Sequence, residues 1–105
     1  MASESAIKTI KEHIAKDKIF VASKSYCPYC KQTKQLLAQY KDAKPVILEL
    51  DELDNGADLQ AALAEITGQR TVPNVFIGGQ HIGGNSDLQL LAQKDELAER
   101  IKAAL

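Results

Sequence analysis

A strand, a helix and a second strand within about 33 residues are the feature that most narrows the folds open to this chain. Residues 19–22 form a short apolar run of β-forming side chains, and residues 46–50 form another, preceded by Pro45. Between them, side chains recur at helical spacing: Thr33, Leu36, Leu37 and Tyr40. The pattern predicts a βαβ unit with two buried parallel strands.

The rest of the chain supplies further helices and a hairpin. Apolar residues at helical spacing predict helices at residues 3–15, around Leu59 to Ile66, around Leu88 and Leu91, and from about Asp95. Gly68 ends the second of these. Gly78-Gly79 joins residues 74–77 to residues 80–82 as a two-residue hairpin. We therefore predict one α/β domain over residues 1–105, with a four-stranded mixed sheet flanked by helices on both faces.

Cys27-Pro28-Tyr29-Cys30 holds both cysteines of the chain and lies where the first strand leads into a helix. Unpaired backbone N–H groups and the helix dipole favour a thiolate on Cys27, whose pKa is expected below the free value of about 8.5. Lys24 adds a positive charge nearby, and Pro28 suits the first helical turn. Cys30 lies one turn further in and is more shielded. The pattern indicates that Cys27 attacks and Cys30 resolves.

The cysteine pair suits a structural bond, a metal site or an inert core less well than it suits redox chemistry. A structural disulfide across two intervening residues closes too small a loop to constrain the unfolded chain. A zinc site could combine the cysteines with His13 and His81, but these histidines lie in unrelated segments without the spacing of a zinc knuckle. Two inert buried cysteines would not require a proline and a tyrosine at a helix start. Redox chemistry is the best interpretation, and no metal is expected.

Composition restricts the compartment and the partners. The chain is 45% hydrophobic and 26% charged, as in a globular protein. Its net charge of −1 gives no basic field for nucleic acid or an anionic membrane. No apolar run is long enough for a membrane span, and the first residues lack the features of a secretory signal. Two cysteines are also too few for a secreted disulfide scaffold, so we expect a cytoplasmic protein.

Two further motifs suit a peptide-like ligand. Thr71-Val72-Pro73 precedes the third strand, and the bond before Pro73 is a candidate for the cis form, which would leave the Val72 backbone open to pair with an extended peptide. Pro73 could also simply start a strand. Residues 83–87 open a helix whose free N–H groups can hold a carboxylate, while Asp87 can receive an ammonium group. For Ser86 and Asp87 alone, N-capping is the simpler role.

Together these motifs resemble the dithiol glutaredoxins over nearly the whole chain, in order and spacing. The residues that carry the resemblance are Lys24, Cys27-Pro28-Tyr29-Cys30, Thr71-Val72-Pro73, Gly83-Gly84 and Ser86-Asp87. The absence of tryptophan argues against thioredoxins proper. The resemblance implies a thioredoxin-like fold, glutathione as the reducing co-substrate, and protein or small-molecule disulfides as substrates.

The resemblance also implies roles for individual residues. Cys27 is the nucleophile and Cys30 its partner in a redox disulfide. Lys24 and Arg70 would lie near the glycine carboxylate of glutathione, with Gln69 as a neighbour. Further glutathione contacts are implied for Tyr29, Thr71, Val72, Pro73, Gly84, Ser86 and Asp87.

Among these contacts, the Val72 backbone would pair with the tripeptide, Tyr29 would flank it, and Ser86 and Asp87 would hold its γ-glutamyl end. Asn85 stands where many family members have an extra cysteine, so regulation through a third thiol is not available. The expected protein is a monomer whose partners are glutathione and glutathionylated or disulfide-containing client proteins.

Two other functions compete with this interpretation. Two chains could hold an iron–sulfur cluster between their Cys27 thiolates with glutathione as co-ligands, although Pro28 should stiffen the motif and disfavour it. Alternatively, the chain could be a thioredoxin-type reductant that takes its electrons from a flavoprotein reductase.

Overall fold

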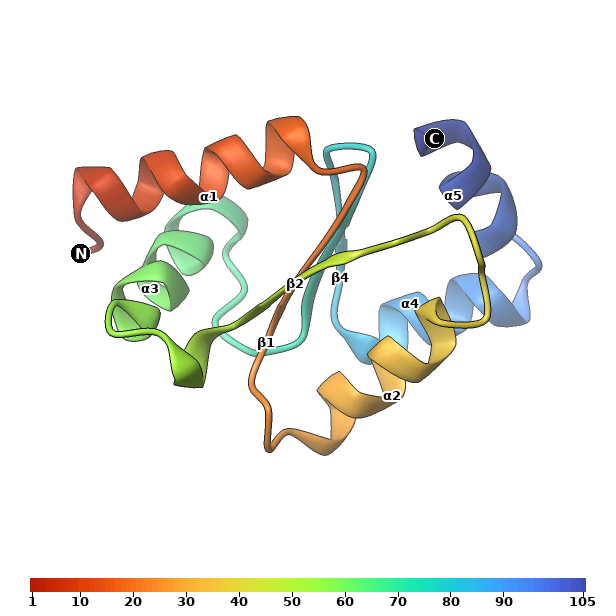
Figure 1. Cartoon of the computed structure of the whole chain (residues 1–105), viewed down its shortest axis with the longest axis horizontal. Helices are drawn as coiled ribbons and strands as arrows, with labels where there is room; N and C mark the ends of the chain where they lie inside the picture. Colours follow the sequence, from red (N-terminus) through yellow and green to blue (C-terminus); the bar gives the residue numbers. More distant parts are fainter.

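The computed structural model describes residues 1–105 as a central sheet with helices on both faces (Figure 1). The strands are β1 (Ile19–Ser23), β2 (Val46–Glu49), β3 (Asn74–Ile77) and β4 (Gln80–Gly83). The helices are α1 (Glu4–Lys16), α2 (Pro28–Leu37), η1 (Leu50–Glu52, a 3-10 helix), α3 (Gly56–Thr67), α4 (Asn85–Gln93) and α5 (Leu97–Ala104). Each helix is too short or too polar to cross a lipid bilayer.

The sheet order is β2-β1-β3-β4, with β1 and β2 parallel and the other two pairs antiparallel. The predicted βαβ unit and mixed sheet are therefore confirmed. Gly78 and Gly79 have φ angles of +59° and +78°, the left-handed pair that a tight hairpin turn requires and that glycine adopts without strain. The hairpin predicted at these two residues is also confirmed.

Alternate residues of β1 supply the two halves of the core. Ile19 and Val21 face α2, α4 and α5, where they pack with Leu37, Val75 and Leu88. On the other face of the sheet, Phe20, Ala22 and Phe76 pack against α1 and α3, which contribute Ile10, Leu59 and Leu63. Because both faces of β1 are covered, its five residues are all buried.

Three details differ from the predictions. The run 46–50 is not a buried strand, because β2 lies at the edge of the sheet: Val46 is 39% exposed and Leu50 belongs to η1. Helix α2 ends at Leu37, so Tyr40 packs on the core from a following turn. The last helix begins at Leu97, two residues after the predicted start.

Candidate active site

Cys27 is the N-cap residue of α2. Its backbone is extended (φ −84°, ψ 120°), and Pro28 occupies the first helical turn. The Cys30 backbone N–H donates to Cys27 Sγ at 3.3 Å, and no acidic residue lies in the first turn. A negatively charged sulfur at this position is stabilised by the donated hydrogen bond and by the helix dipole. The predicted placement of the pair at a helix start is confirmed.

Cys30 differs from Cys27 in its surroundings. Both are free thiols, but Cys27 is half-buried whereas Cys30 is buried. Burial raises the pKa of the Cys30 thiol, and its side-chain hydrogen bond with Cys27 raises it further, which outweighs the lowering by neighbours such as Ser23. Cys30 therefore stays a protonated thiol beside the more accessible sulfur of Cys27.

The segment before β3 lies directly against Cys27. The Cys27 thiol faces the Val72 carbonyl oxygen, with an Sγ–O distance of 3.9 Å. The Val72–Pro73 peptide bond is cis, as the sequence predicts. The backbone of Val72 thus adjoins the sulfur that caps the start of α2.

A cavity of about 450 Å³ adjoins the α2 start and the Val72 segment. This volume lies in the range of small-molecule sites. Its lining residues are Tyr29, Thr71, Val72, Pro73, Gly84, Asn85 and Ser86. Six of these seven belong to the set predicted to bind a ligand. The structure therefore brings three distant stretches of sequence to one hollow.

Four of the predicted ligand-binding residues do not line this cavity, namely Lys24, Gln69, Arg70 and Asp87, and neither do the two cysteines. The Gln69 side chain donates to the carbonyls of Thr71 (3.1 Å) and Pro73 (2.9 Å), so it holds the backbone of two residues that line the cavity. Asp87 accepts from the Gly84 N–H at 2.9 Å and thus stabilises the start of α4, which is the capping role considered for it.

Lys24 and Arg70, the two cationic residues predicted to bind the ligand, are not part of the cavity lining. The Lys24 carbonyl accepts from the Cys27 N–H at 3.0 Å, which closes the turn before α2. Arg70 is exposed, and the only hydrogen bond at this residue is accepted by its carbonyl from Gln60. Neither side chain makes an ion pair or a hydrogen bond within the chain.

Asn85 is a site residue that sequence reasoning did not assign to ligand binding. It lines the cavity and also ties α4 to α2: its Oδ1 accepts from Thr33 Oγ1 at 2.8 Å, and its Nδ2 donates to Gln32 at 2.9 Å. The signal for this link was Thr33, a polar residue on the buried stripe of a predicted helix. A buried hydroxyl needs a partner, and here the partner comes from another helix.

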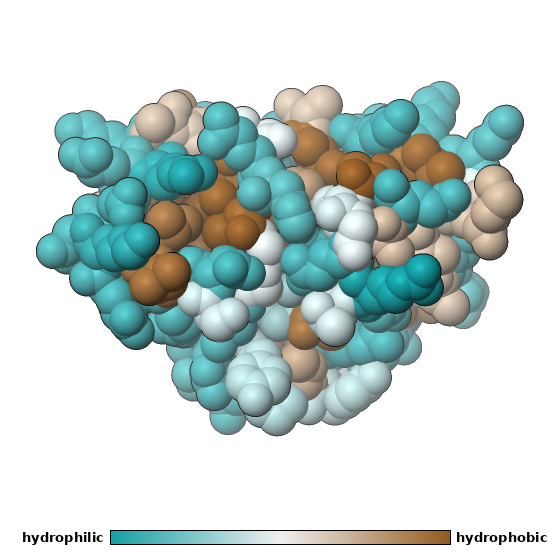
Figure 2. All heavy atoms as spheres, turned by 180° about the vertical axis from the view of Figure 1, so that it is seen from behind, coloured by the Kyte–Doolittle hydropathy of each residue, from teal (hydrophilic) through white to brown (hydrophobic).

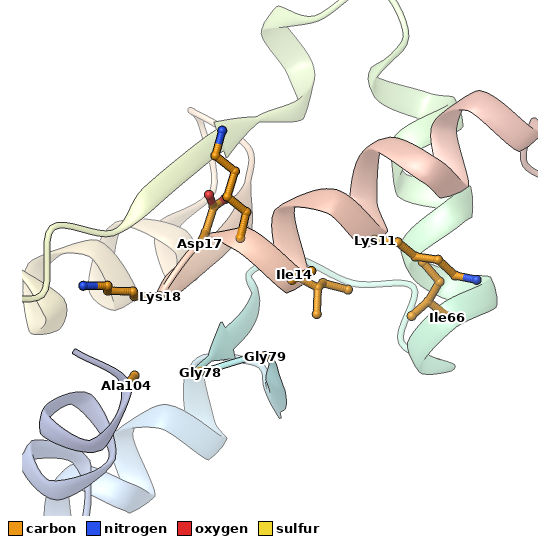
Figure 3. A pocket seen from close by; sticks show the side chains of 10 residues that line it. Lys11, Ile14, Asp17, Lys18, Ile66, Gly78, Gly79 and Ala104 are labelled. Carbon is orange, nitrogen blue, oxygen red and sulfur yellow. The ribbon is translucent and has the colours of Figure 1, made fainter.

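A larger cavity, of about 510 Å³, lies at the opposite end of the sheet, before β1 and at the β3–β4 turn (Figure 3). Its labelled lining includes Lys11, Ile14, Lys18 and Gly79. It contains no cysteine and none of the predicted site residues. The larger hollow is therefore separate from the redox site.

The histidines of the rejected zinc alternative lie elsewhere. The His13 ring stacks on Phe20 and its Nδ1 lies 2.7 Å from Asp17 Oδ2, while His81 Nε2 lies 2.8 Å from Asn74 Oδ1. No three potential metal-ligating side chains of His, Cys, Asp or Glu group together in the chain. The structure does not bring these histidines to the cysteines.

Comparison with known proteins agrees with this geometry. The glutaredoxin family model matches residues 19–82. Glutaredoxin-1 of Saccharomyces cerevisiae is 49% identical over 108 residues, covering 100% of this chain and 98% of the yeast protein. Glutaredoxin-C4 of Arabidopsis thaliana is 45% identical, covering 93% of this chain and 72% of its own length.

Solved structures show the same similarity. The holo form of glutaredoxin C1 from Populus tremula x tremuloides has a TM-score of 0.91 and 46% identity, with 96% of this chain and 90% of that chain covered. A buckwheat glutaredoxin–glutathione complex has a TM-score of 0.92 and 38% identity, with 96% and 91% covered. The sheet, the helix-start cysteines and these similarities together show that the chain belongs to the glutaredoxin family of glutathione-dependent thiol–disulfide oxidoreductases.

Proposed function

We propose that Cys27 is the nucleophile with which the chain reduces glutathione mixed disulfides and protein disulfides, and that Cys30 is the resolving thiol. The observation that carries this assignment is the place of Cys27 Sγ, which accepts from the Cys30 N–H at the α2 start and faces Val72 beside the cavity. Cys30 is buried behind it. The more accessible sulfur of Cys27 can therefore meet a substrate first, and the buried sulfur of Cys30 can only follow.

Glutathione is the ligand that best suits the cavity. The cavity volume of about 450 Å³ accommodates a tripeptide-sized ligand, and a buckwheat relative has been solved as a glutathione complex. The Val72 backbone can pair with an extended peptide, and Tyr29 can flank it. Ser86 at the start of α4 supplies backbone donors for a carboxylate, beside Asp87 for an ammonium group.

The cationic side chains of Lys24 and Arg70 can bind the glycine end of glutathione. Lys24 and Arg70 have side chains without ion pairs, so each is available to the glycine carboxylate of glutathione. Gln69 then acts mainly by holding the carbonyls of Thr71 and Pro73 in place. An arginine suits a carboxylate especially well because it can donate two parallel hydrogen bonds.

For a glutathionylated protein, Cys27 thiolate attacks the sulfur of the glutathionyl group. The protein thiolate leaves and takes up a proton, and a Cys27–glutathione disulfide forms. A second glutathione, as thiolate, then attacks this disulfide and releases oxidised glutathione together with Cys27 thiolate. The second glutathione is oxidised as the protein thiol is reduced, the transferred glutathionyl sulfur stays in a disulfide throughout, and Cys30 takes no part.

For an internal protein disulfide, Cys27 first forms a mixed disulfide with the client. Cys30 loses its proton and attacks Cys27 Sγ, which releases the reduced client and leaves a Cys27–Cys30 disulfide. Two glutathione molecules then reduce this disulfide in succession and leave as oxidised glutathione. The raised pKa of the Cys30 thiol, caused mainly by burial, keeps Cys30 from reacting with substrates on its own.

We further propose that the chain works as a cytoplasmic monomer on glutathionylated or disulfide-containing clients. Its exposed large hydrophobic side chains are spread along the sequence, from Met1 to Leu105. On the face seen in Figure 2, hydrophobic residues form separate small areas among hydrophilic ones. Such scattered exposure is ordinary for a monomer.

The decisive experiment compares electron donors. Purified protein is given a glutathionylated peptide and a disulfide substrate, with electrons from either glutathione plus glutathione reductase or thioredoxin reductase alone, and NADPH consumption is followed. We expect turnover with glutathione only. Turnover with thioredoxin reductase and none with glutathione would contradict the proposal.

A further inference from the structure

The segment Lys24–Tyr26, which joins β1 to Cys27, has a single hydrogen-bonded link to a distant part of the chain. The Ser25 backbone N–H donates to Asp51 Oδ1 at 2.9 Å, and the Ser25 hydroxyl donates to Asp51 Oδ2. Tyr26 is 71% exposed, so it contributes little packing of its own. The position of this segment depends on one carboxylate.

The parallel register of the sheet explains how Asp51 reaches Ser25. Ser23 and Glu49 are paired in β1 and β2. Ser25 and Asp51 each follow two residues later, and parallel strands end at the same edge of a sheet. The two side chains therefore meet just beyond the ends of the strands, beside the turn that leads to Cys27.

The backbone that carries Asp51 is itself held in place. Leu50, the residue before it, is only 2% exposed and packs in the α1–α3 half of the core. Helix α3 begins against it so closely that a Cβ on Gly56 would lie 1.8 Å from the Leu50 carbonyl oxygen. Asp51 thus extends from a fixed backbone to an exposed loop, which is the arrangement of an anchor.

The charge of the Asp51 carboxylate strengthens its hydrogen bonds with Ser25. The two hydrogen bonds from Ser25 lower the pKa of the Asp51 carboxyl, and the nearby Lys24 ammonium lowers it further. Asp51 is therefore ionised at neutral pH and attracts the cation assigned to the glutathione carboxylate. The same carboxylate holds the backbone of the segment through Ser25.

We propose that Asp51 is a positioning residue for the redox reaction: through Ser25 it fixes the Lys24–Tyr26 segment, and with it the place of Cys27 beside Val72. The inference rests on the proposed function, because it assigns Asp51 an effect on that reaction. Asp51 itself touches neither sulfur.

The test compares four variants with the wild type for turnover of a glutathionylated peptide. Asp51→Ala removes both hydrogen bonds and should lower kcat/KM about tenfold or more, since small misplacements of reacting groups have effects of this size. Asp51→Asn keeps an oxygen for the Ser25 N–H and should stay within about threefold of the wild type. Ser25→Ala keeps the backbone bond and should show an intermediate loss. Glu52→Ala is the matched control, because Glu52 is an exposed acidic neighbour on η1.

The double variant Asp51→Ala with Ser25→Ala separates a shared contact from two independent effects. If the two residues act through one link, the double variant should be no slower than Asp51→Ala alone. The proposal is overturned if the losses of the two single variants add in the double variant. It is also overturned if Asp51→Ala has the kcat/KM of the wild type. If Asp51→Ala does not fold, the other two single variants decide whether the proposal holds. A wild-type kcat/KM for Ser25→Ala overturns the proposal. A kcat/KM for Asp51→Asn that is about tenfold or more below the wild-type value overturns it as well.

A measurement without substrate separates this inference from the proposed function. By NMR, the Ser25 amide should exchange with solvent at least about tenfold faster in Asp51→Ala than in the wild type, and at the wild-type rate in Glu52→Ala. An inactive wild type refutes the proposed function. An unchanged Ser25 exchange rate in Asp51→Ala refutes the anchor, whatever the activity.

Discussion

Helices α1 and α2 begin in the same way, with an extended N-cap residue whose side chain accepts from the backbone N–H three residues later. At α1 the acceptor is Ser3 Oγ, 3.1 Å from the Ala6 nitrogen. At α2 it is Cys27 Sγ, 3.3 Å from the Cys30 nitrogen. Because the geometry is shared, any difference in function between the two N-termini must come from the capping atom and from its surroundings.

The surroundings differ in charge and in access. Ser3 donates to Asp58 of α3 through both its hydroxyl and its backbone N–H, so a carboxylate already occupies the α1 start. At α2 the first turn has no acidic residue, and Cys27 Sγ faces Val72 beside a cavity. At the start of α1, the carboxylate of Asp58 already balances the partial positive charge of the helix, and the role of this N-terminus is structural. At the start of α2, no carboxylate does so, and the partial positive charge can stabilise a thiolate.

Cys27→Ser should have the largest effect. The change keeps a good N-cap residue and removes the more accessible of the two sulfurs, the one proposed to attack the substrate. We expect reduction of glutathionylated peptide to fall at least about a thousandfold, while the denaturant midpoint stays at or above that of the wild type. Steady-state kinetics and urea unfolding on the same preparation measure both.

A thiol at the other helix start provides the matched control. Ser3→Cys in the Cys27→Ser background places sulfur in the same cap geometry, but beside Asp58 and away from the cavity. The double variant should remain inactive and should react slowly with iodoacetamide, because the neighbouring carboxylate disfavours a thiolate. Restored reduction would show that cap geometry alone is sufficient, and the comparison of the two helices would fail.

Cys30→Ser should have a smaller and selective effect. Deglutathionylation should persist within about threefold, because that route needs only Cys27, whereas reduction of an internal client disulfide should fall by about a hundredfold or more. In the wild type, the rate of client reduction should also rise with pH, since burial raises the pKa of Cys30 and the attacking form is the thiolate. Equal loss of both activities would refute the assigned roles.

Much of the fold could be predicted because its signals are local. The helix-start cysteines, the Gly78-Gly79 hairpin and the cis bond before Pro73 each depend on a few neighbouring residues. The edge position of β2 could not be predicted, because an apolar run such as 46–50 looks the same at an edge as in the middle of a sheet. Strand order is decided by pairing between residues far apart in sequence.

The same limit applies to the candidate site. Motifs read along the chain found six of the seven residues that line the cavity, but they did not indicate the hydrogen bond from Gln69 to the Pro73 carbonyl. The Ser25–Asp51 link was missed because it depends on the register of β1 with β2. A polar residue two positions beyond each of two parallel strands is a signal that could have indicated it.

Ser3→Ala tests the structural side of the comparison. Loss of the cap and of the hydroxyl bond to Asp58 should lower the free energy of unfolding by about 1 kcal/mol, the usual value for an N-cap serine. Because α1 lies away from the cavity, kcat/KM should stay at the wild-type value. Urea unfolding and steady-state kinetics measure the two quantities, and a loss of activity without a loss of stability would contradict the division of roles.

The smallest expected effect is a dependence of stability on pH that arises at the α1 joint. The hydrogen bonds from Ser3 lower the pKa of Asp58 below its ordinary value of 3.8. A carboxyl whose pKa is lower in the folded than in the unfolded state stabilises the fold above the unfolded value, and this contribution disappears as the pH falls through the folded value. The difference in unfolding free energy between the wild type and Asp58→Asn should therefore be constant from about pH 7 to about pH 5 and shrink below about pH 4.

Urea unfolding across this range measures the difference, with Asp54→Asn as the control because Asp54 makes no side-chain hydrogen bond or ion pair. A difference that grows toward low pH would mean that the hydrogen bonds from Ser3 do not stabilise the Asp58 anion. The conclusion that this carboxylate balances the charge at the start of α1 would then be wrong.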